Sequence, residues 1–130
     1  MQFRRTQGQD PMTDTTTLTP LSHAILLALA AEDRHGYGII KKIVEQSDGT
    51  LRPGTGTLYS ALQRLLDEGL IAESPRSPEP DEDRRRKYYR LTDAGRDAAR
   101  VEALRLARLV AVAREVDVVG EAELARSLGR

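Results

Sequence analysis

The chain has 130 residues, and its 20 basic and 20 acidic side chains give a formal net charge of zero, so any attraction to nucleic acid has to come from local charge. It contains no cysteine, which excludes disulfides and thiolate chemistry, and its 39% of hydrophobic residues suits one small soluble domain. The apolar stretch at residues 24–31 is too short for a membrane span of about 20 residues and lacks the flanks of a signal peptide. We therefore expect a cytoplasmic protein without membrane contact.

The first structured element is expected to be a helix over residues 20–31. Residues 1–17 before it have few apolar side chains and end in a threonine run, which predicts a disordered arm. Thr19 has the chemistry of an N-cap, and Pro20 suits the first position of a helix. The helix is apolar on nearly all sides, so both of its sides should be buried, and one of them can need a second chain.

A second helix is predicted over residues 36–46, and the Ser-Asp-Gly sequence at residues 47–49 ends it. Helical spacing divides this segment into an apolar inner face and a basic outer face. The expected inner face is Ile40, Ile43 and Val44, and the expected outer face carries Lys41 and Lys42.

A third helix is predicted over residues 55–68, with Gly69 as its C-cap. Small residues at the start of its polar face would let the backbone approach a base-pair edge, and hydroxyl, amide and guanidinium groups there can form hydrogen bonds. Tyr59, at the boundary of the two faces, can reach a phosphate. Taken alone, this pattern is more often an ordinary amphipathic helix with a solvated face. The apolar face comprises Leu58, Ala61, Leu62, Leu65 and Leu66, and the polar face comprises Gly56, Thr57, Ser60, Gln63 and Arg64.

A hairpin and a long helix complete the predicted order. Short strands at residues 70–73 and 87–91 enclose a loop rich in proline and charge, and Thr92 then has the chemistry of an N-cap. Three helices, a hairpin and a further helix form the winged helix-turn-helix plan, which suggests DNA binding. The expected fold is mainly α with a small β-hairpin: an arm at residues 1–17, a winged helix-turn-helix domain at 18–92, and at 93–130 a long C-terminal dimerisation helix (93–116) with a short tail helix (121–128).

The loop of the hairpin, which we call the wing, holds the densest charge of the chain. Long cationic side chains at the root of its second strand can reach DNA phosphates. The preceding acids should then point out of the groove or pair with the arginines, at a cost of about 0–1 kcal/mol per exposed pair that DNA breaks. The alternative is a solvated, self-neutralising loop. The cations are Arg84, Arg85, Arg86 and Lys87, and the acids are Glu79, Asp81, Glu82 and Asp83.

The long helix has more apolar surface than it needs to cover a small domain. We expect the excess to pack against a second chain, with the first helix, apolar on both sides, as its partner. A core helix with a broad face is the alternative. A dimer would place two third helices on successive major-groove faces about 34 Å apart, suited to a near-palindromic site. The stripe consists of Ala99, Ala103, Leu106, Leu109, Val110, Ala113 and Val116, widened by Val101, Leu104 and Val112.

Three segments together resemble the PadR family of bacterial transcriptional regulators: "GYGIIKKI", "GTGTLYSALQRLLDEGLI" and "KYYRLTDAGR". The resemblance covers about residues 18–114. It implies a dimeric repressor whose third helix enters the major groove, whose wings touch the flanking backbone and whose C-terminal helix dimerises. Few residues follow Val116, so the chain resembles a branch with a short C-terminal part, and the resemblance says nothing about a larger effector domain.

No sequence feature points to an enzyme, because His23 and His35 have no second ligand at metal spacing and "RPGTGT" lacks the lysine of a phosphate-binding loop. We expect no catalytic residue, no metal and no cofactor. The expected partners are double-stranded DNA and a second copy of the chain; a small-molecule effector is unknown, and Leu, Val and Ala at the expected dimer centre favour an aliphatic one or none. The rival hypothesis is a protein-interaction module that uses the long helix without DNA.

The candidate DNA contacts are Thr55, Thr57, Tyr59, Ser60, Gln63 and Arg64 on the third helix, Tyr37, Lys41, Lys42 and Arg52 on the second helix and the turn after it, and Arg84, Arg85, Arg86 and Lys87 on the wing. The candidate dimer contacts are Leu21, Ile25, Leu106, Leu109, Val110 and Ala113.

Overall fold

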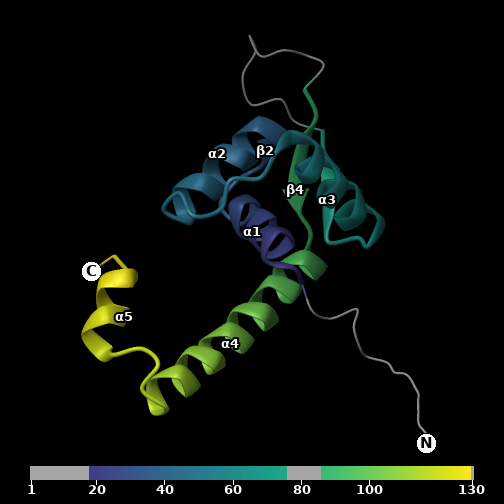
Figure 1. Ribbon diagram of the computed structural model, residues 1–130. Helices are drawn as coiled ribbons and strands as arrows, with labels where there is room; N and C mark the ends of the chain where they lie inside the picture. The colour runs from purple at the N-terminus through teal and green to yellow at the C-terminus, as the bar shows by residue number, and fades with distance from the viewer. Residues whose placement is uncertain (1–17, 76–85, 130) are drawn as a thin grey trace, which may run out of the picture. The chain divides into compact units, whose positions relative to one another are not determined.

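The computed structural model describes residues 18–75 and 86–129. The chain divides into two compact units, the first ending at Ala99 and the second beginning at Arg100. The elements follow the expected order, with one short strand added between the first two helices (Figure 1). They are α1 (Pro20–Leu29), β2 (Arg34–His35), α2 (Gly36–Gln46), α3 (Thr55–Asp67), β3 (Ile71–Ser74), β4 (Tyr88–Leu91), α4 (Asp93–Glu115) and α5 (Glu121–Ser127).

Helix α1 begins as its sequence predicts and ends two residues earlier than expected. The Thr19 hydroxyl accepts a hydrogen bond of 3.0 Å from the Ser22 N–H, which satisfies one of the free donors of the first turn. At the other end, Arg34 Nε donates to the Ala28 carbonyl at 2.7 Å and Arg96 Nη2 donates to the Ala30 carbonyl at 3.0 Å. Two guanidinium groups therefore satisfy the terminal carbonyls and complement the negative end of the helix dipole.

Helix α2 has the predicted bounds but a different inner face. Ile39 and Ile43 are fully buried, whereas the expected Ile40 and Val44 are only partly buried. Of the expected face Ile43 is confirmed, and the buried side is shifted toward Gly36 and Ile39.

Helix α3 presents the predicted apolar face, with Leu58, Ala61, Leu62 and Leu65 buried and Leu66 partly buried. Its last capping position is Glu68, and Gly69 follows with a φ of 77°. Glycine adopts this left-handed conformation without steric cost, which lets the chain turn at once into β3.

The sheet has three strands, where the sequence predicted a two-stranded hairpin. Strand β4 is central and pairs antiparallel with β3 on one side and with β2 on the other. The register places Glu73 opposite Tyr89 in the first pair and His35 opposite Tyr88 in the second. Strand β2 has only two residues, so it carries no alternation of apolar and polar side chains from which it could be predicted.

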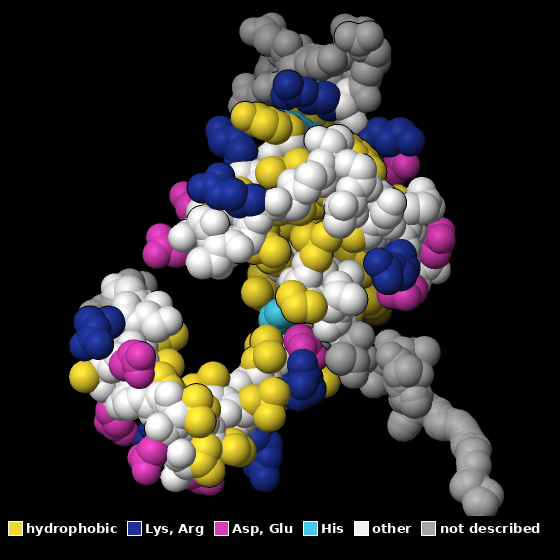
Figure 2. Space-filling model, viewed as in Figure 1, with side chains coloured by type: hydrophobic (Ala, Val, Ile, Leu, Met, Phe, Trp, Pro, Cys, Tyr) yellow, Lys and Arg dark blue, Asp and Glu magenta, His cyan; other side chains and the backbone are white. Residues whose placement is uncertain are grey.

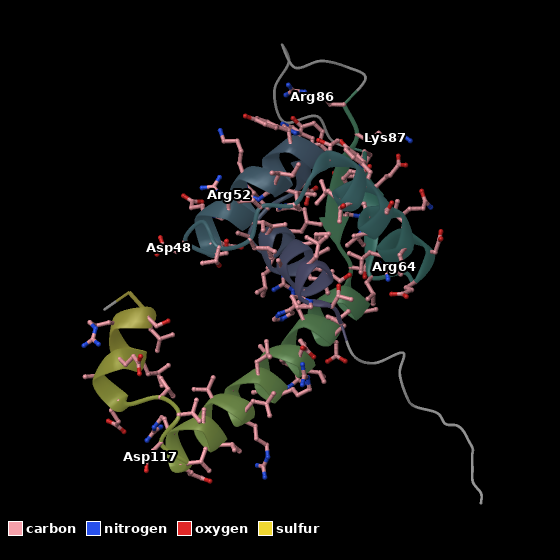
Figure 3. The ribbon with its side chains drawn as sticks, in the orientation of Figure 1. Asp48, Arg52, Arg64, Arg86, Lys87 and Asp117 are labelled. Carbon is pink, nitrogen blue, oxygen red and sulfur yellow. The ribbon has the colours of Figure 1, made fainter. Side chains whose placement is uncertain are left out.

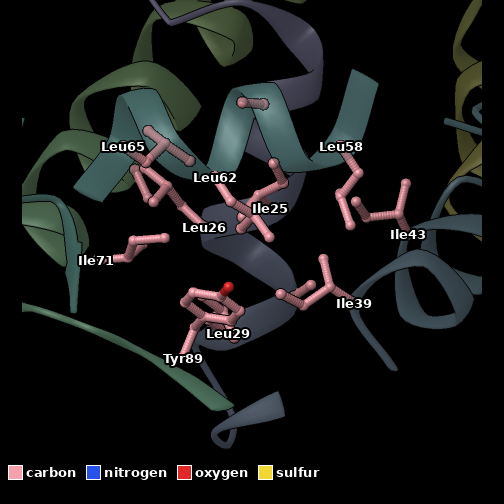
Figure 4. Packing of buried hydrophobic residues seen from close by; sticks show 13 residues of the cluster. Ile25, Leu26, Leu29, Ile39, Ile43, Leu58, Leu62, Leu65, Ile71 and Tyr89 are labelled. Atoms are coloured by element: carbon pink, nitrogen blue, oxygen red, sulfur yellow. The ribbon is translucent and has the colours of Figure 1, made fainter. Parts of the chain in front are cut away.

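The core of the first unit is aliphatic, with one tyrosine from the sheet (Figure 4). Ile25 and Leu26 of α1 have no exposed surface, and they meet Leu62 of α3 and Tyr89 of β4 in the same cluster. The expectation that α1 is buried on both sides is therefore largely fulfilled within the unit itself, except that Leu27 is 42% exposed.

The Leu-Thr-x-x-Gly sequence forms the joint between the sheet and α4. The Thr92 hydroxyl accepts from the Gly95 N–H at 3.0 Å, as expected of an N-cap, and donates to the Gly69 carbonyl at 2.8 Å. A Cβ on Gly95 would collide with the Leu70 carbonyl oxygen, so only glycine allows α4 to start this close to the turn. Two residues thus join the end of α3, the sheet and the start of α4.

The second unit consists of α4 beyond residue 99 and of α5. Asp117, with a φ of 63°, ends the long helix, and Arg114 Nη2 donates to Glu121 Oε2 at 2.7 Å across the turn to α5. Most of its apolar side chains are exposed in the single chain. Among the described residues, no helix is long and apolar enough to cross a membrane.

Candidate nucleic-acid interface

The polar face of α3 is exposed, as its sequence predicts. Thr55, Thr57, Tyr59, Ser60, Gln63 and Arg64 are all accessible. Gln63 Nε2 donates to Asp67 Oδ1 at 3.0 Å, so part of its hydrogen-bonding capacity is used within the helix. The remaining hydroxyls of the first two turns can donate to or accept from base edges.

The two ends of α3 have different electrostatic surroundings. Arg86 and Lys87 lie at the root of the wing, whereas Arg64 lies at the far end of α3, close to the acidic Asp67 and Glu68 of the same helix (Figure 3). Helices of this class contact bases mainly through their N-terminal residues. The structure therefore separates Arg64 from the other cations with which the sequence had grouped it.

A basic groove of about 500 Å³ lies between the first two turns of α2 and the root of the wing. Among the described residues, its lining includes the cations Arg34, Lys41, Lys42 and Arg86 and a single acid, Glu45. Lys42 Nζ pairs with Glu45 Oε1 at 3.1 Å. Lys41 Nζ lies 5.7 Å from the centroid of the Tyr37 ring, within cation–π range. The groove has the charge and the hydrogen-bond donors that suit phosphate groups.

A second groove of about 680 Å³ runs between α3 and the wing root. Tyr59, Gln63, Arg86, Lys87 and Tyr89 are among its lining residues, so Arg86 borders both grooves. Lys87 Nζ lies 3.6 Å from Glu73 Oε2 on the paired strand, and both side chains are more than half exposed. Such an exposed pair is worth about 0–1 kcal/mol, so Lys87 can exchange Glu73 for a phosphate at little cost. Lys and Arg side chains are visible around this end of the unit (Figure 2).

His35 lines the first groove and contacts Arg86, which borders both grooves, and the sequence analysis assigned it no such role. Its Nδ1 accepts the Gly38 N–H at 3.1 Å as the N-cap of α2, and its Nε2 lies 3.3 Å from Arg86 Nη1. Its ring meets the Tyr88 ring edge-on at 5.2 Å and stacks on Tyr37 at 6.4 Å. The only sequence signal is a side chain that can accept a hydrogen bond directly before a helix start, and histidine is not among the common N-caps.

Several predicted contacts fall elsewhere. Arg84 and Arg85 and the acids of the wing lie outside the described residues, as does the arm at residues 1–17. Arg52 is exposed in the turn before α3. Tyr59 does not extend freely into solvent, because its hydroxyl end lies against Gly36 of α2.

Of the predicted dimer contacts, those on α4 are accessible and one on α1 is not. Leu106, Leu109 and Val110 are exposed, and Ala113 and Leu21 are partly exposed. Ile25 has no exposed surface, because it fills the core between α1 and α3. We therefore count Ile25 as a core residue of the first unit rather than as a contact with a second chain.

Burial changes the chemistry of one tyrosine near the wing. The pKa of Tyr89 is raised above its ordinary value, mainly because the hydroxyl is shielded from water and further because of Tyr59 and Glu73 nearby. Tyr89 is thus neutral at physiological pH. Within residues 18–75 and 86–129, no cluster of His, Asp or Glu could hold a metal ion.

Comparison with known proteins agrees with this architecture. A regulator from Clostridium thermocellum is 29% identical, with a TM-score of 0.62 over 73% of this chain and 87% of its own. A PadR family regulator from Clostridium difficile R20291 is 28% identical, with a TM-score of 0.64 over 74% of this chain and 96% of its own. Bacillus subtilis PadR, solved in complex with operator DNA, is 28% identical, with a TM-score of 0.52 over 62% of this chain and 45% of its own.

The search of curated proteins found no significant match. Residues 25–101, more than half of the chain, match the family described as the transcriptional regulator PadR-like family. This segment contains the complete sheet, both grooves and the α3 face described above. The chain therefore belongs to the PadR-like family of transcriptional regulators.

Proposed function

We propose that the protein is a homodimeric repressor that binds a near-palindromic site in double-stranded DNA through α3 and the wing. One observation carries the proposal: a groove with cationic lining lies on each side of the wing root, and the second is bordered by Tyr59 and Gln63 of α3, whose polar face is exposed. A chain with no net charge thus concentrates cations where a duplex would have to lie.

The proposed DNA-binding surface has two kinds of polar group, with different roles. Thr55, Thr57 and Ser60 present hydroxyls on the first turns of α3, and small side chains there allow close approach to base edges. The cations of the first groove, Lys41 and Arg86 in particular, have no such selectivity and suit backbone phosphates. Contacts of the first kind would specify a sequence, and contacts of the second kind would position the protein.

The proposed homodimer is supported by the stripe on α4. Leu106 and Val110 are about 40% exposed in the single chain, and Leu109 is 52% exposed. Solvent-exposed apolar side chains that recur on one helix face favour burial against a second chain. A two-fold dimer would also present two α3 helices to one DNA face, as a near-palindromic site requires.

A gel-shift titration at rising salt tests the proposal. The full chain is mixed with DNA from the region upstream of its own gene and with random DNA of equal length. We expect both DNAs to be bound at low salt and only the upstream DNA to be bound at moderate salt. Salt weakens both complexes, but the specific complex starts from a higher affinity and therefore remains detectable. Equal affinity for the two DNAs at every salt concentration would contradict sequence-specific binding, and no binding to either DNA at low salt would favour the interaction module.

A further inference from the structure

The contact between Gly36 and Tyr59 joins the first residue of α2 to the exposed side of α3. Gly36 is buried, and a Cβ at this position would lie 2.7 Å from Tyr59 Cζ and even closer to the Tyr59 hydroxyl. Cβ atoms essentially never approach other heavy atoms so closely. A side chain at position 36 would therefore displace the Tyr59 ring, which is 46% exposed, from its place against α2.

Backbone conformation does not explain this glycine. Gly36 is the first residue of α2, and it is not among the glycines with positive φ. Any residue can adopt its backbone angles, and the atoms that a Cβ there would meet all belong to the Tyr59 side chain. Gly38, two residues later in the same helix, differs: a Cβ there would meet its nearest atom, His35 Cε1, at an ordinary 3.6 Å.

Tyr59 is also close to the sheet. Tyr59 and Tyr89 line the same groove, and the ionisation of Tyr89 is disfavoured by Tyr59, which places the two phenols within electrostatic reach. Tyr59 is thus against the start of α2 and near the central strand β4. Along α3 it stands between Leu58, which is in the core, and Ser60, which is exposed.

We propose that Tyr59 is a positioning residue for DNA recognition: its contact with Gly36 fixes the rotation of α3, and with it the direction of Thr57 and Ser60. The inference rests on the proposed function. A binding constellation tolerates an error of only about 10–20° in orientation, and turning a helix by that amount redirects every side chain on its face. This role replaces the phosphate contact that the sequence suggested for Tyr59.

The experiment uses four variants of the full chain: Gly36→Ala, Tyr59→Leu, the double variant, and Gly38→Ala as the matched control. Affinities are measured for a DNA enriched from a random pool by the wild-type protein and for random DNA. Gly36→Ala and Tyr59→Leu should each reduce the preference for the enriched DNA by about tenfold, roughly the value of one well-oriented base contact. Gly38→Ala should leave the preference unchanged.

The double variant decides whether the two residues act through one contact. Leucine lacks the ring atoms nearest to Gly36, so adding the alanine methyl to Tyr59→Leu should cost nothing further. Full additivity of the two losses would overturn the proposal. So would an equal loss of affinity on both DNAs in Tyr59→Leu, which is the result expected of a direct phosphate contact.

Thermal unfolding of the same variants without DNA separates this inference from the proposed function. The Tm reductions of the two single variants should be non-additive if the contact exists, whether or not the protein binds DNA. A wild-type protein that enriches no sequence would refute the proposed function and the role in recognition, and non-additive Tm values would then show that the contact itself is real. Additive Tm values would refute the contact even in a sequence-specific binder.

Discussion

The two units of the chain treat their apolar side chains in opposite ways. The first unit buries its large aliphatic residues in one cluster, where residues such as Ile25, Leu58 and Leu62 have at most 1% exposure. In the second unit, Leu104, Leu109 and Val116 are each more than half exposed. The first unit is therefore complete as a folding unit, whereas the second presents a surface whose burial has to come from elsewhere.

The polar surfaces of the two units also differ. The first unit carries the basic grooves and the hydroxyls of α3. In the second unit, Arg105 is engaged with Glu102 at 2.6 Å, and Arg114 with Glu121 at 2.7 Å. We infer a division of labour in which the first unit would contact DNA and the second would contact another chain. The predictions below alter one unit and ask whether the other responds.

The largest effect is expected for Leu106→Glu combined with Val110→Glu. If both residues are buried between two chains, uncompensated carboxylates there cost several kcal/mol, so light scattering should detect monomers or aggregates. Ala107→Glu, at an exposed position of α4 outside the stripe, is the matched control and should leave the dimer intact. A dispersed, folded dimer in the double variant would refute the interface on this stripe.

Next in size is the effect of Leu62→Ala in the core of the first unit. Removing a fully buried leucine should lower the free energy of unfolding by about 2–5 kcal/mol, as measured by urea denaturation. The same change at Leu128, which is 67% exposed and lies outside the stripe on α4, should cost less than about 0.5 kcal/mol. Similar losses of unfolding free energy at the two positions would contradict the contrast between a first unit with a buried core and a second unit with exposed apolar side chains.

Arg86→Ala combined with Lys87→Ala tests the wing root. Each phosphate contact contributes about one unit to the slope of log affinity against log salt, so the slope should become shallower by about two units per bound wing. The loss of affinity should be similar on all DNA sequences. Arg126→Ala in α5 removes a cation from the other unit, and it should leave the slope unchanged. An unchanged slope in the wing variant would remove these residues from the interface.

The smallest effects distinguish the two ends of α3. Thr57→Ala should relax sequence preference at one base pair and cost about 1 kcal/mol on the preferred site, because it removes a single hydroxyl near the helix start. Arg64→Ala should instead weaken all DNAs slightly and alike, since Arg64 lies beside Asp67 and Glu68 at the other end. If only Arg64→Ala reduced the sequence preference, the C-terminal end of α3, and not its N-terminal end, would contact the bases.

Most helix starts and ends could be predicted because they depend on local chemistry. Thr19 and Thr92 act as caps through hydrogen bonds to residues three positions away, and Gly69 ends α3 through its own backbone freedom. The apolar face of α3 follows from spacing alone. In each case the information lies within a few residues, so a single sequence contains it.

The features that were missed depend on contacts between distant segments. Strand β2 exists because Arg34 and His35 meet β4, more than fifty residues later. Ile39 rather than Ile40 is fully buried because α2 packs this side against the core that α1 and α3 share. Ile25 was expected at a dimer contact because its apolar pattern does not reveal which side the remaining elements cover. Helical spacing predicts that a side is apolar but not what buries it.

The most direct test of the division of labour is the stoichiometry and symmetry of the complex with DNA. The full chain is bound to a DNA that it has enriched from a random pool, the mass of the complex is measured by native mass spectrometry, and the contacted bases are mapped by footprinting. We predict two chains per DNA and protection of two half-sites whose centres lie about one helical turn apart, related by two-fold symmetry. A single chain on an asymmetric site would contradict the account.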